Sequence, residues 1–130
     1  MTDTVTALRV ALDGKVTEYT LGDTRSEQAT TLARALTDAP EAIAYLDRPG
    51  HTSIVVLAGL HRARHLPNLF AEIIQTEIAR EAVPVQGPAV FTGVTHDGQF
   101  TALPLEAAAA IRNLCPDNPD GIPVLISFPF

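Results

Sequence analysis

The chain has 130 residues, of which 46% are hydrophobic and 18% charged, and its formal net charge is −6. These totals suit one globular domain over residues 1–130. They favour a compact globule over a disordered chain and argue against a general nucleic-acid binder, which needs a basic face to displace counterions. The single cysteine excludes an internal disulfide, and neither a signal peptide nor an apolar run that could span a membrane is visible, so we expect a cytoplasmic protein.

A β-hairpin is expected at the start of the chain. Its two strands flank Asp13-Gly14, a dipeptide typical of a two-residue type I′ turn. In this register Arg9 lies opposite Glu18 as an oppositely charged cross-strand pair. The expected strands cover residues 7–12 and 15–21.

A helix follows this hairpin. Thr24 and Glu27 form a capping-box pattern, in which Thr24 is the N-cap residue and Glu27 reaches back to it. Apolar residues then recur every three or four positions, and Pro40 ends the helix. The apolar stripe consists of Ala29, Leu32, Ala33 and Leu36.

A second hairpin is expected around the turn at residues 48–50. Residues 41–47 fit a short strand or a continued helix, and we favour the strand because turn chemistry and a strong strand follow. That next strand, over residues 53–58, is apolar on both faces and should be central in a sheet.

The widest apolar stripe of the chain predicts a second helix over about residues 67–81. Pro67 suits the first helical position, where its missing N–H costs nothing. The apolar side is formed by Leu66, Leu69, Phe70, Ile73, Ile74 and Ile78. The side expected to face solvent carries Glu72, Gln75, Glu77 and Arg80.

A third hairpin, a third helix and a last strand complete the pattern. The hairpin flanks Asp97-Gly98, a second type I′ signal, and the helix covers about residues 105–114. The expected strands cover residues 89–96, 99–103 and 123–128. The order ββα ββα ββα β predicts an α+β fold: a mixed, largely antiparallel sheet of about seven strands with three helices packed on it. The two Asp-Gly hairpins fit either a duplication or two uses of one turn.

The basic turn between the central strand and the second helix is the main candidate site. Free N–H groups and the positive dipole end at a helix N-terminus attract anions, and arginine adds bidentate hydrogen bonds. A solvated basic loop without a ligand explains the same residues. The candidate ligands of a phosphate, nucleotide or carboxylate are Gly59, His61, Arg62, Arg64, His65 and Asn68.

Catalytic and metal-binding patterns are not recognised. His61 and His65 are four residues apart, but Pro67 places the helix start after both, so their spacing loses its geometric meaning. No nucleophile motif is present, and Cys115 is interpreted as a small apolar residue at a helix end. We therefore assign no metal ligands and no cofactor, and the sequence favours a protein without enzymatic activity over an enzyme. A metal site that His51 and His96 join is the alternative that the sequence leaves open.

Three stretches resemble an uncharacterised family of phage and actinobacterial proteins, the domain of unknown function three-eight-four-six. They are the opening hairpin at residues 7–21, HLPN at 65–68 and GPAVFTGVTHDGQFTALP at 87–104. The resemblance implies a phage or mobile-element accessory protein that acts by binding.

Three functional hypotheses follow. The first is a non-enzymatic binding protein that engages a protein partner or a second copy of itself, through the second helix or the terminal Phe128 and Phe130. The second is a module for a small anion at residues 59–68, which requires that Arg62 and Arg64 are not paired with carboxylates of the same fold. The third is an antirestriction-like DNA mimic, which requires acidic residues spaced along one face like phosphates.

Overall fold

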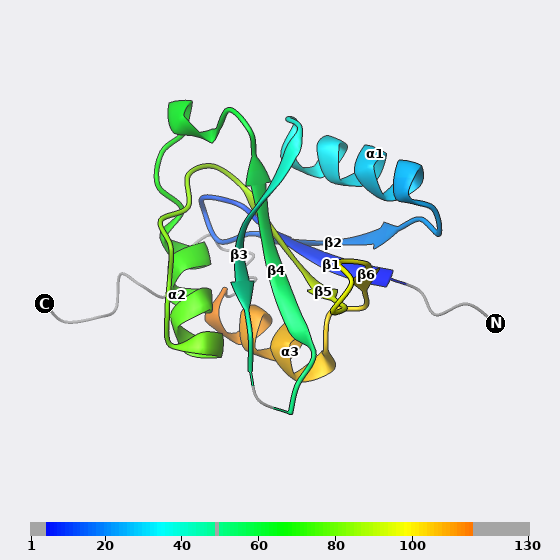
Figure 1. Ribbon diagram of the computed structural model, residues 1–130. Helices are drawn as coiled ribbons and strands as arrows, with labels where there is room; N and C mark the ends of the chain where they lie inside the picture. Colours follow the sequence, from blue (N-terminus) through cyan, green and yellow to red (C-terminus); the bar gives the residue numbers. More distant parts are fainter. Residues whose placement is uncertain (1–4, 49, 116–130) are drawn as a thin grey trace, which may run out of the picture.

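The computed structural model describes residues 5–48 and 50–115, which form one antiparallel sheet with helices on both faces (Figure 1). The order of the described elements confirms the α+β prediction. The predicted last strand over 123–128 and the terminal aromatic residues lie outside the described residues. The elements are β1 (Val5–Val10), β2 (Val16–Leu21), α1 (Arg25–Leu36), β3 (Pro40–Leu46), β4 (Ser53–Gly59), the 3-10 helix η1 (Arg62–Arg64), α2 (Leu69–Ala79), β5 (Ala89–Val94), β6 (Phe100–Thr101) and α3 (Leu105–Leu114).

The sheet has the order β2-β1-β5-β4-β3, and each of its pairings is antiparallel. β6 pairs with the end of β5 at Gly93 and Val94, beyond the part of β5 that β1 covers. The ambiguous segment at 41–47 is a strand, as we favoured, because β3 pairs with β4 along its length. β4 lies between β5 and β3 and is buried from Ile54 to Gly59. This confirms the prediction of a central strand.

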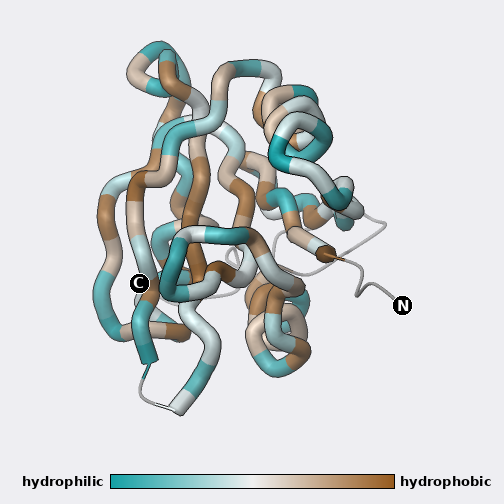
Figure 2. The backbone as a smooth tube through the Cα atoms, turned by 45° about the vertical axis from the view of Figure 1, so that its right-hand side comes forward, coloured by the Kyte–Doolittle hydropathy of each residue, from teal (hydrophilic) through white to brown (hydrophobic). Residues whose placement is uncertain are grey.

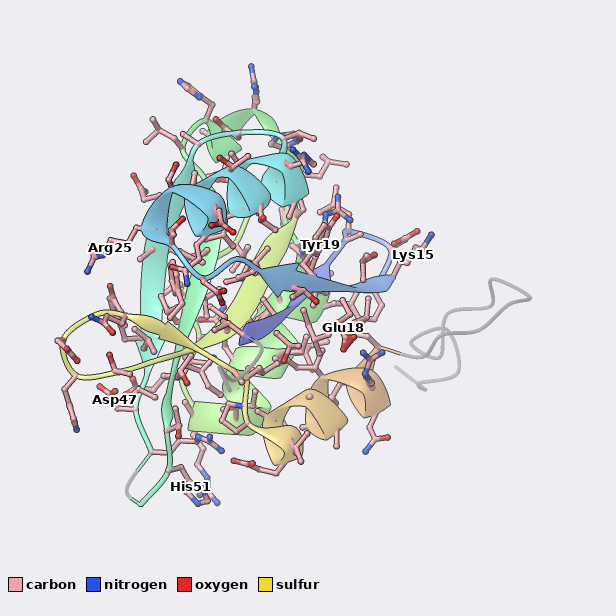
Figure 3. All side chains as sticks on the ribbon, turned by 90° about the vertical axis from the view of Figure 1, so that its right-hand side faces the viewer. Lys15, Glu18, Tyr19, Arg25, Asp47 and His51 are labelled. Atoms are coloured by element: carbon pink, nitrogen blue, oxygen red, sulfur yellow. The ribbon has the colours of Figure 1, made fainter. Side chains whose placement is uncertain are left out.

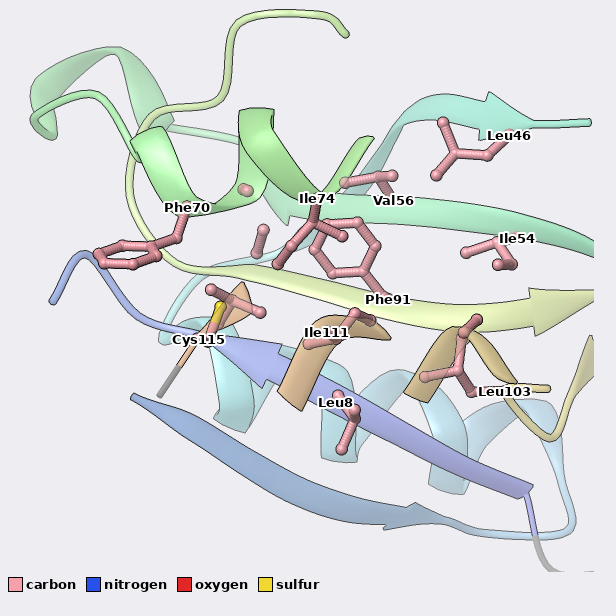
Figure 4. Close-up of a cluster of buried hydrophobic side chains, with 14 of the residues drawn as sticks. Leu8, Leu46, Ile54, Val56, Phe70, Ile74, Phe91, Leu103, Ile111 and Cys115 are labelled. Carbon is pink, nitrogen blue, oxygen red and sulfur yellow. The ribbon is translucent and has the colours of Figure 1, made fainter. Parts of the chain in front are cut away.

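The sheet buries an apolar cluster on each face. α2 and α3 cover one face, where Ile74 and Ile111 pack with Phe91 of β5, all three being fully buried (Figure 4). α1 covers part of the other face through Leu32 and Leu36. In Figure 2 the hydrophobic colouring follows the inner strands, and the loops at their ends are mostly hydrophilic. The described part of the chain contains no helix of the length and apolarity that a membrane crossing requires.

Both predicted type I′ turns are wrong, because each Asp-Gly sequence lies in a three-residue loop. Ala11 N donates to Lys15 O at 3.0 Å and Gly14 N to Ala11 O at 3.0 Å. Gly14 has a φ of +87°, whereas Asp13 is not among the residues with positive φ. This is a type I turn followed by a left-handed glycine, in which only glycine takes the φ that is costly for other residues. The hairpin between β5 and β6 repeats the arrangement, with Gly98 at φ +82°.

The additional loop residue shifts the pairing of β1 and β2 by one position. Arg9 lies opposite Thr17 rather than opposite Glu18. Its Nε donates instead to Ala35 O at 2.7 Å, a carbonyl in the last turn of α1. The predicted cross-strand ion pair is therefore wrong, and Arg9 ties the sheet to the end of a helix, where cations are favourable.

The helices differ from the predictions mainly at their ends. Thr24 caps α1 as predicted, since its Oγ1 accepts from Glu27 N at 3.1 Å, but the helix ends at Leu36, before Pro40. α2 begins at Leu69 with Asn68 as its N-cap residue, two residues after the predicted start. The bounds of α3 are those predicted.

Gln75 of α2 was predicted to face solvent but is fully buried. Its Oε1 accepts from Val83 N at 3.1 Å and its Nε2 donates to Val83 O at 3.1 Å. The side-chain amide thus satisfies both backbone groups of a residue that follows the helix. These hydrogen bonds explain why the polar side chain of Gln75 can be buried without the free-energy cost of unsatisfied polar atoms.

Candidate functional site

The basic turn leaves the sheet at Gly59, passes through η1 and enters α2 at Asn68 (green at the top of Figure 1). Its backbone is held by Asp38, which lies between α1 and β3. Asp38 Oδ2 accepts from His61 N at 2.7 Å, and Oδ1 lies 3.0 Å from His61 Nδ1. The loop therefore has a fixed attachment to the neighbouring loop.

The carboxyl group of Asp38 is shielded, whereas His61 is not. Side-chain exposure is 8% for Asp38 and 65% for His61. The side-chain hydrogen bond from His61, followed by the bond from the His61 backbone, lowers the pKa of Asp38 to about 2. Close packing also explains Gly59, since a β-carbon there would lie 2.7 Å from Asp38 Oδ2. The close approach of Asp38 therefore explains the glycine at position 59, and no ligand is needed to explain it.

The two arginines of the turn have different surroundings. Arg62 Nη1 donates to Glu41 Oε1 at 2.7 Å and to Gly59 O at 3.2 Å. Its charge is therefore neutralised by the fold's own carboxylate. Arg64 is exposed, and no carboxylate of residues 5–48 or 50–115 lies within ion-pair distance of it.

Asn68 points into the protein and not towards a ligand. It is fully buried, its Oδ1 accepts from Ala71 N at 3.0 Å, and its Nδ2 donates to Val10 O at 3.0 Å and Gly87 O at 2.9 Å. It thus joins the start of α2 to the end of β1 and to the segment before β5. His65 packs beside Gly87, where a β-carbon would lie 3.0 Å from the imidazole ring.

The six predicted anion ligands are consequently not gathered around one point. Asn68 and Gly59 have structural contacts, and His61 and Arg62 bind carboxylates. Arg64 presents a cation to solvent. The residues that the sequence did not reveal are Asp38 and Glu41, because nothing local marks a carboxylate that pairs across more than 20 positions.

The described ranges contain neither a cluster of metal ligands nor a cysteine with the features of a nucleophile. Among residues 5–48 and 50–115, no three His, Cys, Asp or Glu side chains are grouped so that they could hold a metal ion. Cys115 follows α3 and is 1% exposed, as expected for a small apolar residue at a helix end. Burial raises the pKa of its thiol to about 11, which disfavours the thiolate that a nucleophile needs.

The described acidic residues are spread over loops, helices and strands. Asp38 and Glu41 hold the basic turn, and Asp13 accepts from Lys15 N at 3.0 Å within a hairpin loop. Asp97 accepts from Thr95 Oγ1 at 2.9 Å, and this hydrogen bond lowers its pKa. Carboxylates with such local structural contacts do not favour the DNA-mimic hypothesis.

An exposed apolar surface adjoins the basic turn. Leu66 is 73% exposed, Leu69 58% and Ile73 37%. We call these three residues the leucine surface. They belong to the stripe that predicted α2, but the core takes up only the part of that stripe that contains Phe70 and Ile74.

The chain was compared with protein-family models, with curated proteins and with solved structures. No match was found in any of the three comparisons.

Proposed function

We propose that this protein is a non-enzymatic binding protein whose partner docks on the leucine surface. The observation that carries the proposal is the exposure of Leu66, Leu69 and Ile73 at the entrance and first turns of one helix. Single exposed leucines are ordinary on protein surfaces, whereas a contiguous apolar patch of more than about a few hundred Å² marks an interaction site.

The arrangement suits a rigid docking surface. Leu69 and Ile73 are four residues apart on α2 and therefore lie on one side of it. The start of the helix is fixed by the buried amide of Asn68. Because the surface is already ordered, a partner would lose little conformational entropy on binding, and each leucine that it buried would contribute about 1.5–3 kcal/mol.

The charges beside the leucine surface indicate the partner's chemistry. Arg64 is exposed two residues before Leu66, and Arg62 is neutralised by Glu41. A partner with an apolar patch edged by a carboxylate would bury the leucines and pair with Arg64. Such edge charges increase association rates and specificity more than affinity.

The test is affinity capture with matched variants. Leu66→Ser combined with Leu69→Ser should lose a partner that the native chain retains, without loss of stability, because both side chains are exposed. The control is Leu105→Ser, since Leu105 is 87% exposed at the start of α3. Retention of every captured protein by the double variant, or equal loss with Leu105→Ser, would contradict the proposal. Light scattering of the purified chain distinguishes a second copy from another protein as the partner.

The other hypotheses stay predictions with their own tests. Anion binding at residues 59–68 now depends on Arg64, since Arg62 pairs with Glu41. Phosphate titration should therefore shift the amide resonances of residues 63–66 and fail to do so in Arg64→Gln. The phage or mobile-element relation and the cytoplasmic location remain expectations from the sequence.

A further inference from the structure

The face of the sheet under α1 is only partly covered and contains a cavity of about 570 Å³. The cavity lies between α1 and the β5–β6 hairpin, which are separated by more than 50 residues in the chain. Its volume falls within the range of about 300–1,000 Å³ that is typical of small-molecule sites. It is separate from the leucine surface, none of whose residues lines it.

Part of the lining of this cavity is apolar. Leu32 of α1 and Leu57 of β4 are 2% and 4% exposed, and both line it. Phe100 of β6 and Val5 of β1 are only half-buried, although they pack against the apolar cluster on this face. Incompletely covered apolar walls favour a ligand with an apolar body, which would remove this surface from water.

The lining of the cavity also contains opposite charges and amide groups. Asp23 and Arg25 both line it and are exposed, and within residues 5–48 and 50–115 neither forms an ion pair with the other or with a third residue. The charge of Arg25 acts on Asp97 of the neighbouring hairpin and contributes to the lowered pKa of that carboxyl group. Gln28 Nε2 donates to Gly22 O at 3.0 Å and so braces the turn that carries Asp23. Figure 3 shows Arg25 at the start of α1, on the same side of the molecule as the tip of the β5–β6 hairpin.

We propose that this cavity binds a small zwitterion with an apolar body, of the class of aromatic and branched-chain amino acids. The carboxylate of the ligand would pair with Arg25 and its ammonium group with Asp23. The side chain would lie against Leu57 and Phe100. A headgroup with only one charge would pair with only one of these two side chains.

Four probes that share an indole ring test the headgroup: indole, tryptamine, indole-3-acetate and tryptophan. Binding is followed by amide chemical shifts of the full chain, with Leu57 and Phe100 as reporters. Tryptophan should bind about fivefold more tightly than either singly charged probe, because an exposed ion pair contributes up to about 1 kcal/mol. Asp23→Asn should weaken the binding of tryptophan and tryptamine and leave the binding of indole-3-acetate unchanged. Arg25→Gln should weaken the binding of tryptophan and indole-3-acetate.

A cavity-filling variant tests the location. Ala29 is an exposed residue of α1 that lines the cavity, so Ala29→Phe should abolish tryptophan binding. Ala109→Phe is the matched control, since Ala109 is an exposed alanine of α3 and does not line the cavity. The proposal is overturned if none of the probes shifts the reporters at about 10 mM, if indole binds as tightly as tryptophan, or if Ala29→Phe binds like the native chain.

Discussion

Replacing Asn68 with alanine is expected to destabilise the protein strongly, although the sequence alone marked this residue only as a candidate anion ligand. The substitution removes the N-cap acceptor of α2 and both donors that reach Val10 O and Gly87 O. Loss of the cap costs about 1 kcal/mol. Each buried hydrogen bond contributes about 0.5–1.5 kcal/mol. We therefore expect the free energy of unfolding to fall by about 2–4 kcal/mol, a large part of the stability of a small domain.

Urea unfolding of three chains separates these contributions. Asn68→Ser retains a side-chain acceptor for Ala71 N but has no amide that reaches both carbonyls, so its stability should lie between those of the native chain and Asn68→Ala. The slope of unfolding against urea should be the same in all three, so that midpoints compare stabilities. The reasoning fails if Asn68→Ala costs less than about 0.5 kcal/mol or if Asn68→Ser is as stable as the native chain.

Three further predictions concern the contacts around the basic turn and α2. Gly59→Ala should lower the free energy of unfolding by about 1–3 kcal/mol, because the added carbon meets Asp38, and an unchanged urea midpoint would exclude that close packing. The pKa of Asp38 lies near 2 instead of 3.8, so its contribution to stability is present above about pH 4 and lost as the pH falls towards 2. The difference in melting temperature between the native chain and Asp38→Asn should therefore shrink over that interval, and a constant difference would contradict the assigned hydrogen bonds from His61. Gln75→Leu should speed hydrogen exchange at the Val83 amide, whose acceptor is the Gln75 Oε1, and exchange at the native rate would show that another group protects it.

Local patterns in the chain were sufficient to identify the α-helices and strands of the described residues. α3 has its predicted bounds, and Thr24 caps α1 as its spacing from Glu27 indicated. The apolar run of β4 indicated a strand with neighbours on both sides, which the sheet order confirms. These features depend on periodicity and on hydrogen bonds between residues three or four positions apart, so the sequence alone contains them.

Turn geometry was ambiguous in the sequence, because Asp-Gly fits both two-residue and three-residue loops. The pairing register depends on that choice, and a shift by one residue moved Arg9 from Glu18 to the end of α1. Gln75 was misplaced for a related reason. A glutamine on a helix has no local sign that Val83 will present its backbone to it.

The candidate sites depend on contacts between distant parts of the chain. Composition marked the basic turn, but the carboxylates that pair with His61 and Arg62 come from 23 and 21 residues away. Asn68 likewise bonds to Val10 O across 58 residues. Composition and periodicity fix which segments become helices and strands. Which side chains meet, which leucines stay exposed and where a cavity opens follow from how those segments pack, because such contacts exist only after the chain has folded.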